Sequence, residues 1–236
     1  TATVLSDTRA LSVLKKRFNS KLVAFGAQIS GAYKETLGKI PDIDIGIIGE
    51  PEYTVLDLVQ NFNLSNLSNV SGIVWRNGKE IFVNNRRNWI EDLNQLPQPA
   101  WDMLPLEKYI LPFINKNYLL VETSRGCPFA CDFCVAPLIH GIKFREKKPE
   151  TVVNEIADLK SKYKIEYFYL FGDTVTLNKR FVNEFCEELI KRNLKIQWLT
   201  NTRADTLYDI ELVKKMKESG CWMLAIGIES FSEKTR

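Results

Sequence analysis

Apolar residues recur at two different spacings along the first part of the chain, and the change of spacing marks alternating strands and helices. Short apolar runs at 3–5, 21–25 and 43–48 predict buried strands. Apolar positions at helical spacing predict helices at 8–18 and 52–61. Strands that alternate with helices in this way predict a parallel sheet with helices on its faces.

A β-hairpin is predicted after the second of these helices. Residues 72–76 and 79–83 flank Asn77-Gly78, the residue pair that type I′ turns prefer. We therefore expect residues 1–96 to form an incomplete Rossmann-like α/β domain, in which a parallel sheet carries an added hairpin.

The second half of the chain repeats the strand–helix pattern more regularly. Strands are predicted at 118–122, 165–171, 195–199 and 221–228, and helices at 149–162, 179–191 and 209–218. This alternation predicts a partial (β/α) barrel over 118–236. The carboxyl ends of barrel strands share one mouth, so we expect the polar residues that follow each strand to converge there.

Prolines separate the two halves. Pro97, Pro99, Pro105 and Pro112 fall within a short stretch, and proline disfavours both helix and central strand. We interpret residues 97–117 as a linker and expect Trp101 and Tyr109 to be buried between the halves.

Composition and charge limit the classes of partner. Hydrophobic residues make up 45% of the chain and charged residues 26%, as in globular proteins. The net charge of +3 is too small to argue for a nucleic-acid partner, and no apolar run is long enough for a membrane helix. No signal peptide is visible and the cysteines do not suggest a disulfide framework, so we expect a cytoplasmic protein. Both ends of the sequence suggest a fragment.

Three cysteines in one loop carry the chemistry. Cys127, Cys131 and Cys134 follow a predicted strand at gaps of four and three residues. Thiolates suit iron–sulfur clusters and zinc. A structural zinc site needs four ligands, and no second cysteine pair is present. Three ligands on a four-iron cubane would leave one iron open to a small molecule.

The remaining cysteines and the basic residues near the loop have simpler interpretations. Cys186 and Cys221 lie in apolar segments and are expected to be core thiols. His140 is expected to be a loop residue, and the run from Lys143 to Lys148 a solvated basic face.

At this point the chain resembles the radical S-adenosylmethionine (SAM) enzymes, whose signature is C-x-x-x-C-x-x-C. The resemblance implies that Cys127, Cys131 and Cys134 hold a 4Fe–4S cluster, whose open iron binds SAM and whose electron releases a 5′-deoxyadenosyl radical. It also implies a set of SAM-binding residues: Phe133 at the adenine, Gly172 and Asp173 at the amino group, Arg203 at the carboxylate, Glu229 at the ribose, and Thr200 at the shared strand ends. Two of these have an alternative, since Asp173 would also suit a helix cap and Arg203 a surface ion pair.

The first half is similar to the cobalamin-binding domain of cobalamin-dependent radical SAM enzymes. The features that carry this resemblance are two strand ends, the hairpin and the proline-rich stretch. The strand ends supply the residues that would contact cobalamin: Gly26, Ala27, Gln28, Ser30, Gly49 and Glu50. One departure is the absence of an Asp-x-His-x-x-Gly loop, whose histidine ligates cobalt in many such domains.

The resemblance implies methylation of an unactivated carbon of a small molecule or natural product, with an electron donor such as flavodoxin or ferredoxin. A radical rearrangement or ring closure is the alternative within the family. A metal-stabilised RNA-binding module is an alternative of another class. Its support is the pI near 8.5 and scattered lysines, and it would require a fourth protein ligand for its metal.

Overall fold

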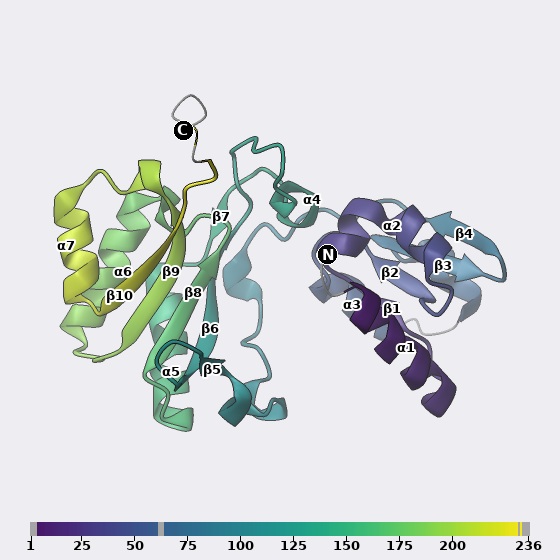
Figure 1. Ribbon diagram of the computed structural model, residues 1–236, viewed down its shortest axis with the longest axis horizontal. Coiled ribbons are helices and arrows are strands. Elements are labelled where there is room, and N and C mark those ends of the chain that lie inside the picture. Colours follow the sequence, from purple (N-terminus) through teal and green to yellow (C-terminus); the bar gives the residue numbers. More distant parts are fainter. Residues whose placement is uncertain (1–3, 61–63, 231, 233–236) are drawn as a thin grey trace. The chain divides into compact units, whose positions relative to one another are not determined.

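The computed structural model describes residues 4–60, 64–230 and 232. The chain forms two compact units (Figure 1). The first combines Thr1–Ile90 with Gly126–Lys143, and the second combines Glu91–Arg125 with Phe144–Arg236. The stretch that carries the three cysteines therefore groups with the N-terminal residues, which the predicted boundaries did not anticipate. Among the described residues, no helix is both long and apolar enough to cross a membrane.

The first unit is built on a four-stranded sheet in the order β1-β2-β3-β4. Strands β1 (Val23–Ala24) and β2 (Ile45–Ile47) pair in parallel, as the βα order predicts. The connection between them is α2 (Ala27–Lys39), and α3 (Glu52–Gln60) follows β2. The predicted helix 52–61 corresponds to α3, except that residue 61 lies outside the described residues.

One expectation for this unit was wrong, and one helix was not expected. Residues 4 and 5 are not in a strand but open α1 (Val4–Phe18), while residue 3 lies outside the described residues. A run this short does not distinguish a strand from a helix. The sequence also gave no sign of α2, which contains Gly31 and Gly38 and is kinked at Ala32, where φ is −142° and ψ is 40°. Glycine weakens a helix and the kink breaks its apolar period.

The hairpin is present, but its turn lies one residue later than expected. Strands β3 (Ile73–Asn77) and β4 (Glu80–Val83) pair antiparallel, with Asn77 opposite Glu80. The turn residues are therefore Gly78 and Lys79, and Gly78 has a φ of 59°. Glycine at the first turn position is typical of a type II′ turn. Since β3 pairs antiparallel with β2, the hairpin extends the parallel pair into a mixed sheet.

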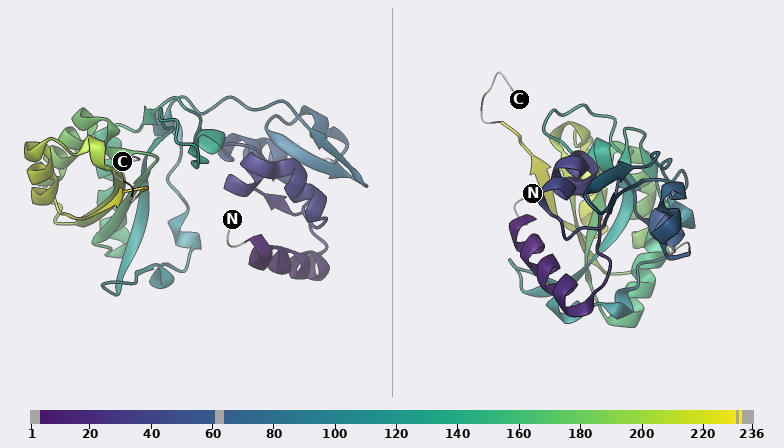
Figure 2. Two further views of the ribbon diagram at one scale, coloured as in Figure 1. Left: turned by 45° about the horizontal axis from the view of Figure 1, so that its top comes forward. Right: turned by 90° about the vertical axis from the view of Figure 1, so that its right-hand side faces the viewer.

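The second unit is the predicted partial (β/α) barrel. Strands β6 (Lys116–Arg125), β8 (Tyr167–Gly172), β9 (Gln197–Arg203) and β10 (Cys221–Gly227) are parallel and lie in the order β10-β9-β8-β6. Helices α5 (Pro149–Tyr163), α6 (Lys179–Lys191) and α7 (Ile210–Glu218) cover one face of this sheet (Figure 1 and Figure 2). Two short strands, β5 (Ile110–Leu111) and β7 (Arg145–Glu146), pair antiparallel with β6.

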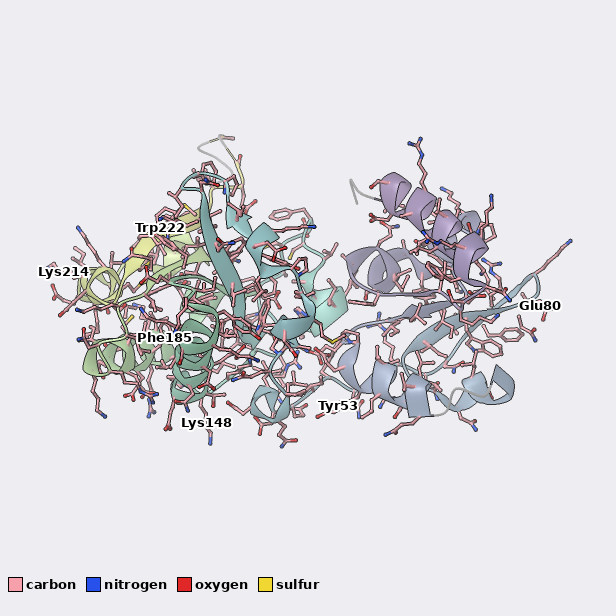
Figure 3. The ribbon with its side chains drawn as sticks, turned by 90° about the horizontal axis from the view of Figure 1, so that it is seen from below. Tyr53, Glu80, Lys148, Phe185, Lys214 and Trp222 are labelled. Carbon is pink, nitrogen blue, oxygen red and sulfur yellow. The ribbon has the colours of Figure 1, made fainter. Side chains whose placement is uncertain are left out.

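The core of the second unit lies between the sheet and these helices. Alternate strand residues such as Leu119, Phe168 and Trp198 point toward the helices and are almost fully buried. Phe185 of α6, labelled in Figure 3, packs edge-on against Trp198 with ring centroids 5.6 Å apart. Because every second strand residue enters this core, the intervening residues are left to the opposite face of the sheet.

The proline-rich stretch is part of the second unit. It contains two 3₁₀ turns, Trp101–Met103 and Leu106–Lys108, and the edge strand β5. Trp101 is 8% exposed and belongs to the same core cluster as the strands of the barrel. Tyr109 is half-buried. The linker therefore anchors itself on the barrel through Trp101.

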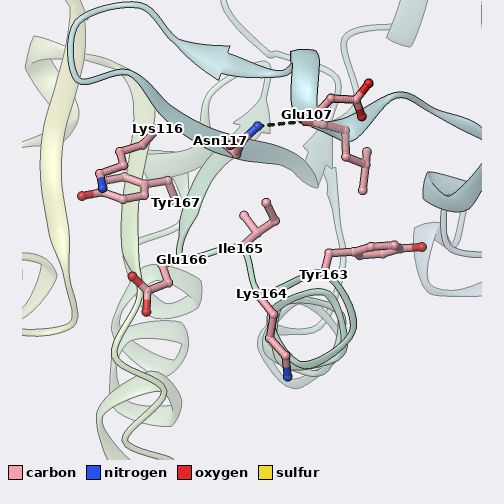
Figure 4. A pocket seen from close by; sticks show the side chains of 9 residues that line it. Glu107, Lys116, Asn117, Tyr163, Lys164, Ile165, Glu166 and Tyr167 are labelled. Atoms are coloured by element: carbon pink, nitrogen blue, oxygen red, sulfur yellow. Dashed lines mark hydrogen bonds between the residues drawn. The ribbon is translucent and has the colours of Figure 1, made fainter.

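A cavity of about 470 Å³ lies beside this stretch, at the amino ends of β6 and β8 (Figure 4). Its lining includes Glu107, Lys116 and Tyr167, and the Asn117 side chain donates to the Leu106 carbonyl at 3.1 Å. Reactions in barrels of this type occur at the other ends of the strands, so this cavity lies away from the expected site.

The basic run after the cysteine loop is partly buried, contrary to expectation. Arg145 and Lys147 are 5% and 6% exposed. The Lys147 ammonium lies 3.0 Å from a carboxylate oxygen of Glu155 on α5, and both side chains are at most 7% exposed. The Lys147 amide also donates to the Thr123 carbonyl at 2.8 Å. The ion pair attaches the segment after the cysteine loop to a helix, and the backbone bond attaches it to the sheet.

We predict that Lys147→Met lowers the free energy of unfolding by about 3–5 kcal/mol, because it leaves the Glu155 carboxylate buried without its cation. Adding Glu155→Leu should recover much of this loss. The matched control is Lys214→Met, since Lys214 and Glu211 form an ion pair at 2.8 Å with 67% and 82% of their side chains exposed. Urea denaturation measures all three. Equal losses of stability in Lys147→Met and Lys214→Met would show that the buried ion pair with Glu155 does not stabilise the fold more than an exposed one.

Candidate cofactor site

The cysteine loop is closed at its base by backbone pairing. Strand β6 ends at Arg125, and β7 returns beside it with Ser124 opposite Glu146 and Arg125 opposite Arg145. Gly126 then has a φ of 82°, and a Cβ atom there would lie 2.1 Å from the carbonyl oxygen of Lys143. Only glycine permits both this φ and this approach. The loop therefore leaves and re-enters the sheet through a narrow neck.

The three cysteines within the loop differ in exposure. Cys127 is 9% exposed, Cys131 is half-buried and Cys134 is exposed. The Cys127 amide donates to the Gly141 carbonyl at 3.3 Å, and the Cys134 amide donates to the Cys131 carbonyl at 3.0 Å. The Cys134 sulfur accepts from the Ala136 amide at 3.4 Å.

The donor set fits an iron–sulfur cluster. The loop brings three soft sulfur ligands within eight residues, and a cluster takes each cysteine on a different iron. Among the described ranges, no three His, Cys, Asp or Glu side chains are gathered where one metal ion could sit. Phe133 between the second and third cysteines is 67% exposed and remains available to a ligand.

The other two cysteines have the character of core thiols. Burial raises the pKa of Cys186 to about 11 and that of Cys221 to about 12. Both thiols are therefore protonated near neutral pH, and a metal binds the thiolate. His140 ends α4 (Ala136–His140), a short helix inside the loop that the sequence did not predict.

Near the carboxyl end of β9, Asn201 lies on the open face of the sheet, whereas the sequence predicts that Thr200 lies at the shared strand ends. The predicted strand stopped at residue 199, but β9 continues to Arg203. Thr200 therefore lies on the helix-covered face with Trp198, is fully buried and donates to the Leu170 carbonyl at 2.9 Å. Asn201 lies on the other face, where it accepts from the Tyr169 hydroxyl at 3.3 Å and donates to the Gly172 carbonyl at 3.3 Å.

Gly172 and Asp173 end β8 beside β6. A Cβ atom on Gly172 would lie 2.4 Å from the Ser124 hydroxyl oxygen, so glycine is needed for the two strand ends to meet. Asp173 is half-buried. It is not the cap of α6, because Asn178 fills that role by accepting from the Arg180 amide at 3.0 Å. The helix-cap alternative for Asp173 is thereby removed.

Arg203 is the last residue of β9, and Glu229 lies two residues after β10. Arg203 forms a two-bond ion pair with Asp205, at 2.9 and 2.6 Å, which lowers the pKa of the Asp205 carboxyl. This ion pair is the structural alternative to a SAM-binding role for Arg203. The guanidinium binds the carboxylate of Asp205. Glu229 is exposed, and its φ is 60°. Its carboxylate folds back to within 2.3 Å of where a Cβ on Gly227 would stand.

Three buried hydroxyls tie the loops after β8 and β9 together. Thr176 bonds both Thr202 and Thr206, and the last two lie 3.0 Å apart. Thr206 also donates to the Arg203 carbonyl at 2.8 Å. The sequence did not single out these residues. Their bonds fix the backbone that carries Arg203 relative to the segment after Asp173.

In the first unit, the residues that were expected to contact cobalamin divide into two groups. Gly26 precedes α2 with a φ of 105°, and nothing lies within 4 Å of a Cβ built there. Ala27 and Gln28 are half-buried beside it, and Gln28 donates to Thr36 at 3.1 Å.

The second group is engaged within the protein: Gly49 and Glu50 follow β2, and Ser30 lies in α2. Ser30 is 2% exposed and accepts from the Gly49 amide at 3.0 Å. Glu50 is 5% exposed and accepts from the Ile90 amide at 2.7 Å. Ser30, Gly49 and Glu50 therefore have structural contacts, while the open strand end is at Gly26.

Comparison with known proteins agrees with the partial barrel seen in the second half of the chain. Residues 121–236 match the Radical SAM superfamily. Over 98% of its length the chain is 29% identical to an uncharacterized methyltransferase of Pyrococcus horikoshii, of which it covers 50%. Over 99% of its length it is 32% identical to the anaerobic magnesium-protoporphyrin IX monomethyl ester cyclase of Rubrivivax gelatinosus, of which it covers 43%. The chain thus spans about half the length of the curated relatives it matches.

Among solved structures, the fold is similar to that of the radical S-adenosylmethionine methyltransferase TsrM from Kitasatospora setae, a structure with cobalamin and a 4Fe–4S cluster bound. The TM-score is 0.77 at 12% identity, over 98% of this chain and 47% of that one. The family match, the partial barrel and the cysteine loop after its first strand agree, and through residues 121–236 the chain belongs to the Radical SAM superfamily.

Proposed function

We propose that the chain binds a 4Fe–4S cluster through Cys127, Cys131 and Cys134 and binds SAM at the iron without a protein ligand. The observation that carries this proposal is the cysteine loop itself, which a neck at Gly126 closes directly after the first barrel strand. When bound, the cluster and SAM supply a 5′-deoxyadenosyl radical. The chain's own residues bind, orient and shield the reactants.

The proposed roles of the protein residues follow from their chemistry. Phe133 is exposed and offers an aromatic face to the adenine. Arg203 already holds a carboxylate in a two-bond geometry, and it would hold the SAM carboxylate in the same way. Asp173 would accept from the SAM amino group. Asn201, with Tyr169, adds a polar pair on the open face of the sheet.

The proposed overall reaction is cobalamin-dependent methylation of an unactivated carbon. Its support is the methyltransferase relative and the fold shared with TsrM. In the first unit, Gly26 is the strand end that leaves room for a ligand, because a Cβ there would meet no atom within 4 Å. Cobalamin would bind beside Gly26, Ala27 and Gln28. Ser30, Gly49 and Glu50 would support this edge of the sheet through hydrogen bonds within the protein.

Ring closure without methyl transfer is the second candidate. The relative that favours it is the magnesium-protoporphyrin IX monomethyl ester cyclase, which covers nearly the whole of this chain at slightly higher identity than the methyltransferase. Either reaction would take a small molecule or natural product as substrate and would need a reductant such as flavodoxin or ferredoxin.

The cluster assignment is tested by reconstituting the chain with iron and sulfide under anaerobic conditions. We predict that Cys131→Ala abolishes the bound cluster, because the cluster loses one of its three thiolates. Cys186→Ala is the matched control and should leave iron and sulfide content unchanged, since the Cys186 thiol is buried with a pKa near 11. Iron analysis and absorption spectra measure both variants. Loss of the cluster in Cys186→Ala would overturn the three-ligand assignment.

SAM binding is tested at Arg203. We predict that Arg203→Lys weakens SAM binding by about tenfold, because lysine cannot form the two parallel bonds to a carboxylate. Arg192→Lys is the control, since Arg192 pairs with Glu188 at 2.7 Å at the far end of α6. The electron paramagnetic resonance signal of the reduced cluster, titrated with SAM, reports the affinity. Unchanged affinity in Arg203→Lys would remove Arg203 from the site.

A further inference from the structure

Trp89 has no part in the site described above, yet its indole fills the space between two glycines. A Cβ atom on Gly49 would lie 2.9 Å from the benzene edge of the indole, at Cζ3. A Cβ atom on Gly141 would lie 2.7 Å from Nε1 on the pyrrole edge. Both glycines are buried and both have positive φ, of 86° and 76°. The indole therefore lies against the backbone on two sides.

The two glycines belong to different parts of the first unit. Gly49 follows β2 of the N-terminal sheet, and Gly141 directly follows α4 inside the cysteine loop. The carbonyl of Ile139, also in the loop, lies 3.7 Å from the Cβ position of Gly49. Trp89 is thus the side chain that fills the junction between the end of β2 and the cysteine loop.

Both sides of this junction are held by hydrogen bonds. On the sheet side, the amide of Gly49 donates to Ser30, and the amide of Ile90, next to Trp89, donates to Glu50. These acceptors are 2% and 5% exposed, so the bonds are shielded from water. On the loop side, the Gly141 carbonyl accepts from the Cys127 amide at 3.3 Å. A continuous set of contacts therefore runs from β2 through Trp89 to Cys127.

We propose that Trp89 is a positioning residue for Cys127. The indole holds Gly141 in place, and Gly141 holds the backbone of the first cysteine. Because Gly49 has no side chain, the indole fits against its backbone. Gly49 then supports Trp89 and does not contact a ligand. This inference rests on the proposed function, because it assigns Trp89 a role toward the cluster.

The test measures how fast the reconstituted cluster loses iron to a chelator. Removal of a group that orients a metal ligand typically costs tenfold or more, so Trp89→Ala should release iron about tenfold faster than the unaltered chain. Trp89→Phe, which restores an aromatic ring at the junction, should show an intermediate rate. The shape of the reduced cluster's electron paramagnetic resonance signal should also change in Trp89→Ala, which loss of general stability would not cause.

Trp75→Ala is the matched control. Trp75 belongs to the same unit and is half-buried, but it stacks on Phe82 in the hairpin with ring centroids 4.8 Å apart. Its rate of iron loss should stay within about twofold of the unaltered chain, well below the effect of removing an orienting group. An equal acceleration in Trp75→Ala would overturn the proposal, because the effect would then be general destabilisation.

The remaining outcomes are also decisive. If Trp89→Ala folds and releases iron at the rate of the unaltered chain, Trp89 has no positioning role. If Trp89→Ala does not fold, Trp89→Phe decides alone, and an unchanged rate and signal in that variant would overturn the proposal. A failure of the unaltered chain to take up any cluster would instead contradict the proposed function.

Discussion

The approach of Gly126 to the Lys143 carbonyl is the constraint on which the cysteine loop depends. A side chain at 126 would overlap that oxygen, and the positive φ would strain any other residue. Because the two chain segments can come this close, β7 can pair with the end of β6 immediately outside the loop. The loop therefore starts and ends at fixed points, and its three cysteines are confined to the short stretch between them.

Both ends of the loop are anchored more strongly than a surface loop requires. The segment after the loop is anchored by the buried ion pair between Lys147 and Glu155. Removing either partner would leave the other charge buried without a counter-ion. Inside the loop, α4 is followed by Gly141, which contacts Trp89 and accepts a hydrogen bond from the Cys127 amide. An open loop would leave the sulfurs free to move, whereas these anchors restrict them in advance of cluster binding.

Much of the barrel could be predicted from sequence, because its helices have strong apolar periods and its strands are fully covered on one face. Helix α6 begins and ends at the predicted residues. The cysteine motif could also be recognised from sequence, because it is defined by the spacing of its three cysteines. Polar residues at strand ends were harder. Thr200 is buried on the helix-covered face and Asn201 lies on the open face, because the length of β9 decides which residues share a face.

Other features could not be predicted because they depend on contacts between distant segments. Helix α2 is weakened by its glycines and the kink at Ala32, and it forms only with the support of its neighbours. Lys147 resembles a solvent-exposed lysine until Glu155 is placed beside it. Trp89 carries no motif, and its purpose emerges only when Gly49 and Gly141 are seen on its two sides.

The central claim is that the cluster has one iron without a protein ligand. Mössbauer spectroscopy of the chain reconstituted with ⁵⁷Fe tests it most directly, because each iron of a cubane contributes to the spectrum. Addition of SAM should shift the signal of a single iron and leave the other three unchanged. A spectrum that SAM does not alter, in protein with a complete cluster, would contradict the claim.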